Sequence, residues 1–151
     1  MCRVLSIDIG EVNFGYSRWT AARGFYDFGV VNLKKTKGDM ASRIHAIWKQ
    51  GFFDNADVIL VERQMRAKFK EAVVAIRCVG NNFEKTRVVA PQSVKRHFAT
   101  SKLNHRQNKK AHIKLAQSFL NDDELTRLDA FKKKDDICDC IVQTKFFLEK
   151  Y

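Results

Sequence analysis

The stretch VLSIDIG at residues 4–10 decides the predicted fold. Its apolar residues alternate with Ser6 and Asp8, and a period of two residues is typical of a β-strand. Gly10 ends the strand. A carboxylate buried alone in so apolar a strand costs on the order of several kcal/mol. Asp8 is therefore expected to lie in a cleft or beside a cation, unless it only caps the following turn.

Further strands and helices follow in an order that predicts the fold class. Residues 13–17 and 25–33 continue the extended pattern, so the chain opens as an antiparallel meander. The apolar run at 58–61 is typical of a strand buried on both faces, and a short strand precedes Pro91. Helical periodicity is predicted over residues 40–50, 64–79, 93–98, 109–120 and 134–148.

This order predicts an α/β domain over residues 1–151. Its central β-sheet is expected to be mixed, with three antiparallel strands followed by parallel ones and α-helices on its flanks. The sequence contains no repeat, low-complexity stretch or linker, and its length suits a single hydrophobic core. We therefore predict one domain.

The net charge indicates which class of partner the protein binds. The 28 Lys and Arg outnumber the 17 Asp and Glu and leave a net charge of +11, which favours a polyanionic partner, most often nucleic acid. An anionic membrane surface is the alternative. No apolar run approaches the roughly 20 residues that span a bilayer. The N-terminus lacks the features of a signal peptide, so we expect an intracellular protein.

The four cysteines indicate reduced thiols rather than a metal or disulfide site. Cys138 and Cys140 are separated by one residue, which is too close for ordinary zinc ligand spacing. The other two cysteines are Cys2 and Cys78. Cys78 and Cys140 lie among apolar residues of predicted helices, so both are expected to be small buried hydrophobes.

Further carboxylates repeat the anomaly of Asp8. Glu62 follows four aliphatic residues at the end of a strand, although a Glu that opens a helix would also complement the helix dipole. Asp136 and Asp139, or Asp135 and Asp139, share one face of the last predicted helix. Neutralisation by the preceding lysines is the alternative explanation for that cluster.

A divalent metal site would explain these carboxylates together. Strand ends and one helix start would bring oxygen ligands to the same crevice, and Mg²⁺ prefers oxygen ligands. Two such ions, about 4 Å apart, activate a water and stabilise the leaving oxygen of a phosphodiester. We expect Mg²⁺, with Mn²⁺ as a substitute. The metal ligands predicted are Asp8, Glu62, Asp136 and Asp139, with Asp135 as a possible addition.

The ordered motifs resemble those of a known family. SIDIG at 6–10, NFG at 13–15, LVERQ at 60–64 and KKDDICDCIVQ at 133–143 resemble the RuvC-like Holliday junction resolvases of the ribonuclease-H-like superfamily. The length, composition and wording of the motifs look closest to the poxvirus resolvases. The resemblance spans the whole chain.

The resemblance implies a ribonuclease-H-like fold and an endodeoxyribonuclease. Such an enzyme is a homodimer that makes paired symmetric nicks in four-way and other branched DNA, and so resolves recombination or replication intermediates of a virus. It implies the host-cell cytoplasm as the location. It also matches Asp8, Glu62, Asp136 and Asp139 to the catalytic carboxylates.

The resemblance further predicts a catalytic lysine. PQSVK at 91–95 resembles one lysine-containing motif of the family, and Lys110 in KAHI at 110–113 matches a second lysine near the active site. Lys109 fits the second position nearly as well. The loop between the two motifs is longer than in the bacterial enzymes and contains no glycine.

A basic segment from residue 95 to 114 is predicted to bind DNA. It contains no acid, so it should contact backbone phosphates without reading sequence. Arg63 and Arg66 would extend this surface, and Phe14 and Tyr16 either stack on an opened junction or pack in the core. The basic residues of the segment are Lys95, Arg96, Lys102, Arg106, Lys109, Lys110 and Lys114.

Two other functions remain compatible with the sequence. A nuclease of the same fold would act on RNA–DNA hybrid, and an inactive relative would only bind DNA. The full set of carboxylates argues against a pure binder, because such a cluster repels phosphate. The apolar stripe of residues 64–79 packs either on the sheet or against a second copy of the chain.

Overall fold

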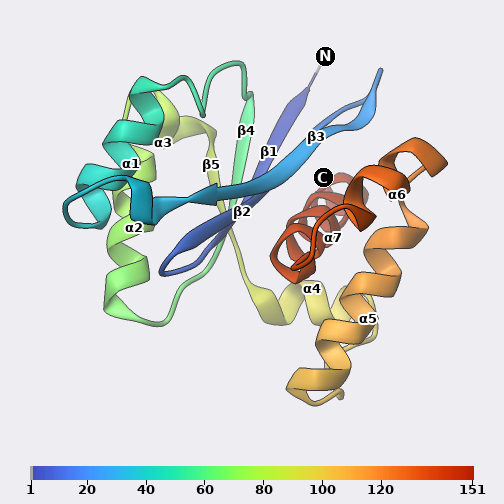
Figure 1. Cartoon of the computed structure of the whole chain (residues 1–151). Coiled ribbons are helices and arrows are strands. Elements are labelled where there is room, and N and C mark those ends of the chain that lie inside the picture. Colours follow the sequence, from blue (N-terminus) through green and yellow to red (C-terminus); the bar gives the residue numbers. More distant parts are fainter. Residues whose placement is uncertain (1) are drawn as a thin grey trace.

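One mixed sheet organises the structure. In the computed structural model, which describes residues 2–151, the five strands lie in the order β3-β2-β1-β4-β5 (Figure 1). β1 pairs antiparallel with β2 and β2 with β3, whereas β4 runs parallel to β1 and β5 parallel to β4. The predicted fold class is thereby confirmed. The bounds are β1 Arg3–Ile9, β2 Asn13–Thr20, β3 Gly24–Asn32, β4 Val58–Glu62 and β5 Thr86–Val89.

Helices cover both faces of the sheet. Figure 1 places α1, α2 and α3 on one side and α4 to α7 on the other. The bounds are α1 Met40–Lys49, α2 Ala67–Cys78, α3 Asn82–Lys85, α4 Pro91–His97, α5 His105–Ser118, α6 Asp122–Asp129 and α7 Asp135–Lys150, with a 3₁₀ turn at Leu33–Lys35.

α5 and α6 differ from the prediction, and a capping motif explains the start of each helix. α5 begins earlier than predicted because Asn104 and Gln107 form a reciprocal capping box before it. α6 was not predicted, although Asn121 and Glu124 form the same motif at its start. α2 begins at Ala67 instead of Gln64, which leaves Glu62 outside any helix. The explanation of Glu62 as a first-turn residue is therefore excluded.

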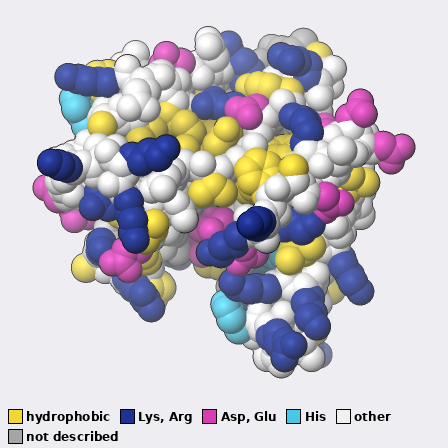
Figure 2. Space-filling view, viewed as in Figure 1, with side chains coloured by type: hydrophobic (Ala, Val, Ile, Leu, Met, Phe, Trp, Pro, Cys, Tyr) yellow, Lys and Arg dark blue, Asp and Glu magenta, His cyan; other side chains and the backbone are white. Residues whose placement is uncertain are grey.

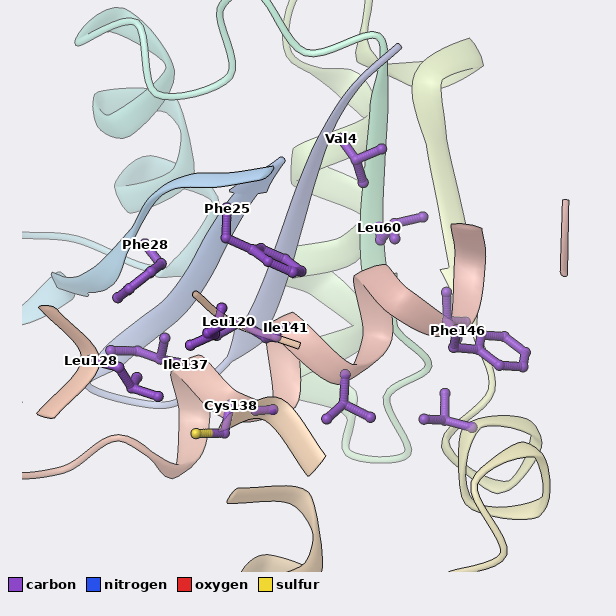
Figure 3. Packing of buried hydrophobic residues seen from close by; sticks show 14 residues of the cluster. Val4, Phe25, Phe28, Leu60, Leu120, Leu128, Ile137, Cys138, Ile141 and Phe146 are labelled. Carbon is purple, nitrogen blue, oxygen red and sulfur yellow. The ribbon is translucent and has the colours of Figure 1, made fainter. Parts of the chain in front are cut away.

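The alternation along β1 separates two apolar cores. Leu5, Ile7 and Ile9 pack against α1 and α2, and the neighbouring strands add Phe14, which is fully buried. That burial excludes Phe14 from stacking on DNA. Val4 belongs to the other core, which forms between the sheet and α7. Figure 3 shows side chains of this core, with Ile137 and Ile141 of α7 below the strands that carry Val4 and Phe25.

α7 is buried on most of its surface, and polar contacts fix its position on the sheet. The Nε2 amide of Gln143 donates to the Ser6 hydroxyl at 2.8 Å. The hydroxyls of Ser17 and Thr144 lie 3.3 Å apart. A buried polar group left unpaired costs about 1–3 kcal/mol, so these pairs favour one register of α7 over others.

The prediction for Cys78 was wrong. Cys140 is buried as expected, but Cys78 is exposed at the end of α2, because the buried residues of α2 are Ala72 and Ile76 and a residue two places further on does not share their face. Burial raises the pKa of Cys138 to about 12, which keeps this thiol protonated and unreactive. None of the helices in residues 2–151 is long and apolar enough to cross a membrane.

Candidate active site

Asp8 and Glu62 lie at the carboxyl ends of adjacent parallel strands. Ile7 pairs with Val61 across β1 and β4, so the residues that follow them lie level with one another. Both carboxylates point to the face that α7 covers, because Leu60 and Val4 on the same sides of these strands belong to the α7 core. This is the crevice in which open α/β sheets bind ligands.

Burial raises the pKa of both carboxylates. Burial is the largest cause for Asp8 and raises its pKa by disfavouring the charged form. Neighbouring acids raise the pKa further, to about 8; in decreasing order of effect they are Asp139, Glu62, Asp136 and Asp135. The pKa of Glu62 is also raised, first by burial and second by the charge of Asp139. Lys95 and His112 lower it, but by less. The carboxylates thus surround Asp8 closely enough to disfavour its charge.

Gly15 lets the start of α7 approach the sheet. This residue pairs with Asp8 across β1 and β2. A Cβ at Gly15 would lie 2.8 Å from the carbonyl carbon, the carbonyl oxygen and the Cβ of Asp136. The missing side chain therefore brings Asp136 beside Asp8, and it explains the glycine in the NFG motif.

Each acid at the start of α7 has a basic side chain as its own partner. The Lys109 ammonium lies 2.7 Å from Asp135, and Lys133 lies 3.4 Å from Asp136. His112 lies 2.6 Å from Asp139. Burial works to raise the pKa of Asp135, but the Lys109 ammonium holds it below its usual range. These pairs offset the repulsion that adjacent carboxylates exert on one another.

A cavity of about 280 Å³ opens between the sheet, α4, α5 and α7. It contains Lys109 and not Lys110, because the lysine at 109 shares a helix face with His112 and Ala116. The carboxylates that line it are Glu62 and Asp139. Among its other walls are Lys95, Lys109, His112 and Gln143.

His112 is the site residue that sequence reasoning missed. It lies in the KAHI motif at residues 110–113, two residues after Lys110. The spacing of Lys109, His112 and Ala116 carried a usable signal, since residues three and four apart share one helix face. Ala116 is fully buried, so the same face of α5 must meet the rest of the protein.

The predicted metal ligands have the chemistry of a magnesium site. All are carboxylates, and the raised pKa of Asp8 shows the mutual repulsion that a bound cation would relieve. Among residues 2–151, no three His, Cys, Asp or Glu side chains are gathered closely enough to hold an ion. The metal site stays a prediction.

The basic residues of the predicted DNA surface lie on or next to α4 and α5. Lys95 and Lys109 both reach the cavity, and every one of these residues except the half-buried Lys95 is exposed. Arg63 and Arg66 are exposed after β4. Figure 2 shows Lys and Arg side chains on the lower right projection, which α5 forms in Figure 1. The exposed residues of the segment are Arg96, Lys102, Arg106, Lys109, Lys110 and Lys114.

The strand order and the carboxylates of β1, β4 and the last helix define the class of protein. This is the RuvC-like arrangement of the ribonuclease-H-like fold. The chain belongs to the poxvirus A22 protein family, whose model matches residues 3–149. The predicted resemblance to the poxvirus RuvC-like proteins is confirmed in family and in fold.

Solved structures agree with this assignment. A fowlpox virus resolvase in complex with Holliday junction DNA is 19% identical, with a TM-score of 0.71 and 97% of each chain covered. T. thermophilus RuvC in complex with a Holliday junction substrate is 15% identical, with a TM-score of 0.63, and the match covers 99% of this chain and 96% of that one. Comparison with curated proteins gives no match.

Proposed function

We propose that the protein is a Holliday junction resolvase, a metal-dependent endonuclease that makes paired symmetric nicks in four-way and other branched DNA. The observation that carries the proposal is a cavity lined by Glu62 and Asp139, with Asp8 close to both carboxylates and with Lys95 and Lys109 in the cavity walls. Membership of a poxvirus family supports a role in resolving viral recombination or replication intermediates, in the host-cell cytoplasm. We treat residues 1–151 as one nuclease domain.

Asp8, Glu62, Asp136 and Asp139 would hold Mg²⁺. When bound, the ions supply activation of a water and stabilisation of the leaving oxygen. Asp136 is preferred to Asp135 because it packs against Gly15 and contributes more to the raised pKa of Asp8. Asp135 instead pairs with Lys109.

We assign the catalytic lysine to Lys109 in place of Lys110. Lys109 lines the cavity with Glu62 and Asp139, and its pairing with Asp135 aims it toward the carboxylates. Lys110 lies one residue further round the exposed side of α5 and is better placed to contact backbone phosphates.

A homodimer would use the exposed apolar side chains on and beside α2. Met65 and Val74 are 82% and 59% exposed, and Phe83 is 63% exposed on α3. Such exposed apolar side chains are typical of interaction surfaces. A two-fold dimer also suits a junction with two equivalent strands to cut. Gel filtration should give twice 17.5 kDa for the wild type and 17.5 kDa for Val74→Glu.

The activity is tested by offering a synthetic four-way junction, a linear duplex and an RNA–DNA hybrid, each with Mg²⁺ and then with EDTA. Paired nicks in the junction alone, lost with EDTA and in Asp136→Asn, would support the proposal. Cleavage of the hybrid would identify the alternative nuclease. Binding of the junction without cleavage under any divalent ion would refute the enzyme and leave a DNA-binding protein.

A further inference from the structure

His112 makes a short contact with one carboxylate of the proposed site. Its Nδ1 lies 2.6 Å from Oδ1 of Asp139. An ionised carboxylate offers only acceptors, so Nδ1 carries the proton and donates it. The imidazole is 13% exposed and the carboxylate 35% exposed, so this is a partly buried hydrogen bond between α5 and α7.

Asp139 needs such an anchor because it faces other acids. It lines the cavity together with Glu62, and it lies one helical turn from Asp135 and Asp136 on α7. These carboxylates repel it, and it lies near enough to solvent to turn away. The hydrogen bond holds Oδ1 toward α5 and leaves the second oxygen, Oδ2, without an interaction with His112.

The other nitrogen of His112 is enclosed by protein. Nε2 has almost no exposed surface and no hydrogen-bond partner among residues 2–151. A nitrogen that binds an ion or takes a proton from a water must be reachable from the cavity. The contact through Nδ1 is therefore the one that acts on the site.

We infer that His112 is a positioning residue, which fixes the orientation of Asp139 so that this carboxylate is ready to bind the divalent cation. The inference rests on the proposed function, since it takes Asp139 as a metal ligand. Partners that orient metal ligands typically change metal affinity or activity by about 10–100-fold when they are removed. We expect His112→Ala to weaken metal binding within that range.

Two amide substitutions separate the roles of the two ring nitrogens. The Nδ2 of Asn can replace Nδ1 as the donor to Asp139, whereas Gln places its amide nearer to the position of Nε2. His112→Asn should keep metal affinity within about threefold of the wild type, and His112→Gln should lose about as much as His112→Ala. Mn²⁺ binding, followed by the loss of the free-ion signal in electron paramagnetic resonance, measures this without any cleavage.

His97→Ala is the matched control. His97 joins α4 to the same helix α7 through a 2.7 Å contact with Glu149, remote from the carboxylates. If a histidine that packs against α7 affected Mn²⁺ binding only by supporting the structure, His97→Ala should weaken that binding too. We expect the Mn²⁺ affinity of His97→Ala to equal that of the wild type. Thermal melting of all variants establishes whether they fold. If His112→Ala does not fold, the comparison of His112→Asn with His112→Gln still tests the inference.

Cleavage of the junction gives a second readout if the proposed function holds. His112→Gln should lower kcat with little change in KM, because DNA contacts remain. The inference is overturned if His112→Gln binds Mn²⁺ like the wild type while His112→Asn does not, since Nε2 would then be the active atom. It is also overturned if both variants bind normally or both lose affinity equally. A wild type that binds Mn²⁺ but never cuts the junction would refute the proposed function alone.

Discussion

The two faces of the sheet use the same strands in different ways. Toward α1 and α2, β1 from Leu5 onward and β4 present aliphatic side chains, and the layer they form is a plain apolar core. Toward α7, the same strands present Ser6, Asp8 and Glu62 beside Val4 and Leu60. Stability and chemistry are therefore divided between the faces by the period-two alternation of a strand.

The polar face is held by specific partners instead of packing alone. Gln143 pairs with Ser6, and His112 pairs with Asp139, each across two elements. Such contacts have demanding geometry, so they fix the register of α7 over the carboxylates. The apolar face tolerates changes of shape better than the polar face tolerates changes of chemistry.

The two faces should differ most in how substitutions affect the cleavage rate and the free energy of unfolding. The comparison removes one charge from the polar face and one large side chain from the apolar face. Asp139→Asn should reduce the cleavage rate by about a thousandfold or more, because acids that act as a unit lose most of their effect together. Its free energy of unfolding should not fall, since a repelling charge disappears. Activity assays and urea denaturation measure the two quantities.

Ile44→Ala on α1 should do the opposite. Ile44 is fully buried in the apolar face, so a cavity there should cost about 2–5 kcal/mol. The cleavage rate per folded molecule should stay that of the wild type. A large fall in rate below the melting transition would contradict the division between the faces.

Asp8→Asn should stabilise the metal-free protein at pH 8 to 9. Burial and the neighbouring acids raise the pKa of Asp8 from 3.8 to about 8. Between these values the folded protein keeps a proton that the unfolded chain releases, so stability falls as the pH rises through this range. Each unit of pKa difference between the folded and unfolded states corresponds to about 1.4 kcal/mol. Asp8→Asn should therefore raise the free energy of unfolding by on the order of a few kcal/mol at pH 9.

The gain from Asp8→Asn should vanish near pH 3.5, below both pKa values, and activity should be lost at every pH. Mg²⁺ should raise the melting temperature of the wild type at pH 8 more than that of the variant, because an ion that binds only the folded state stabilises it. Equal stabilisation of both by Mg²⁺ would show that Asp8 is no ligand. Thermal melting in EDTA across the pH range makes the comparison.

How much of this could be predicted from sequence depends on the range of each interaction. The alternation around Asp8 and the end of β4 at Glu62 are local patterns, and both gave the correct face and position. The choice of Asp136 needs Gly15, which is close only in the folded protein. The contact of His112 with Asp139 depends on how α5 crosses α7, and no local pattern encodes that crossing.

Gly15→Ala tests how closely the polar face must pack. The new Cβ would meet the backbone of Asp136 at 2.8 Å, so α7 or β2 must move. Overpacking of this kind costs about 1–3 kcal/mol, and the shifted Asp136 should lower kcat as well. Gly29→Ala is the control, because the atoms nearest to its new Cβ belong to the end of the Tyr16 side chain, at 3.2 Å, and not to the backbone. Equal effects of the two substitutions on kcat would contradict the role given to Gly15.

The smallest effect separates two adjacent lysines on α5. Lys109→Gln should lower kcat by about tenfold, as expected for loss of one positioned charge, with little change in junction affinity. Lys110→Gln should instead weaken binding and reduce the slope of log affinity against log salt by about one, with kcat kept. Single-turnover cleavage and binding titrations in Ca²⁺ at several salt concentrations distinguish rate from affinity. A fall in kcat confined to Lys110→Gln would restore the original sequence prediction of Lys110 as the catalytic lysine.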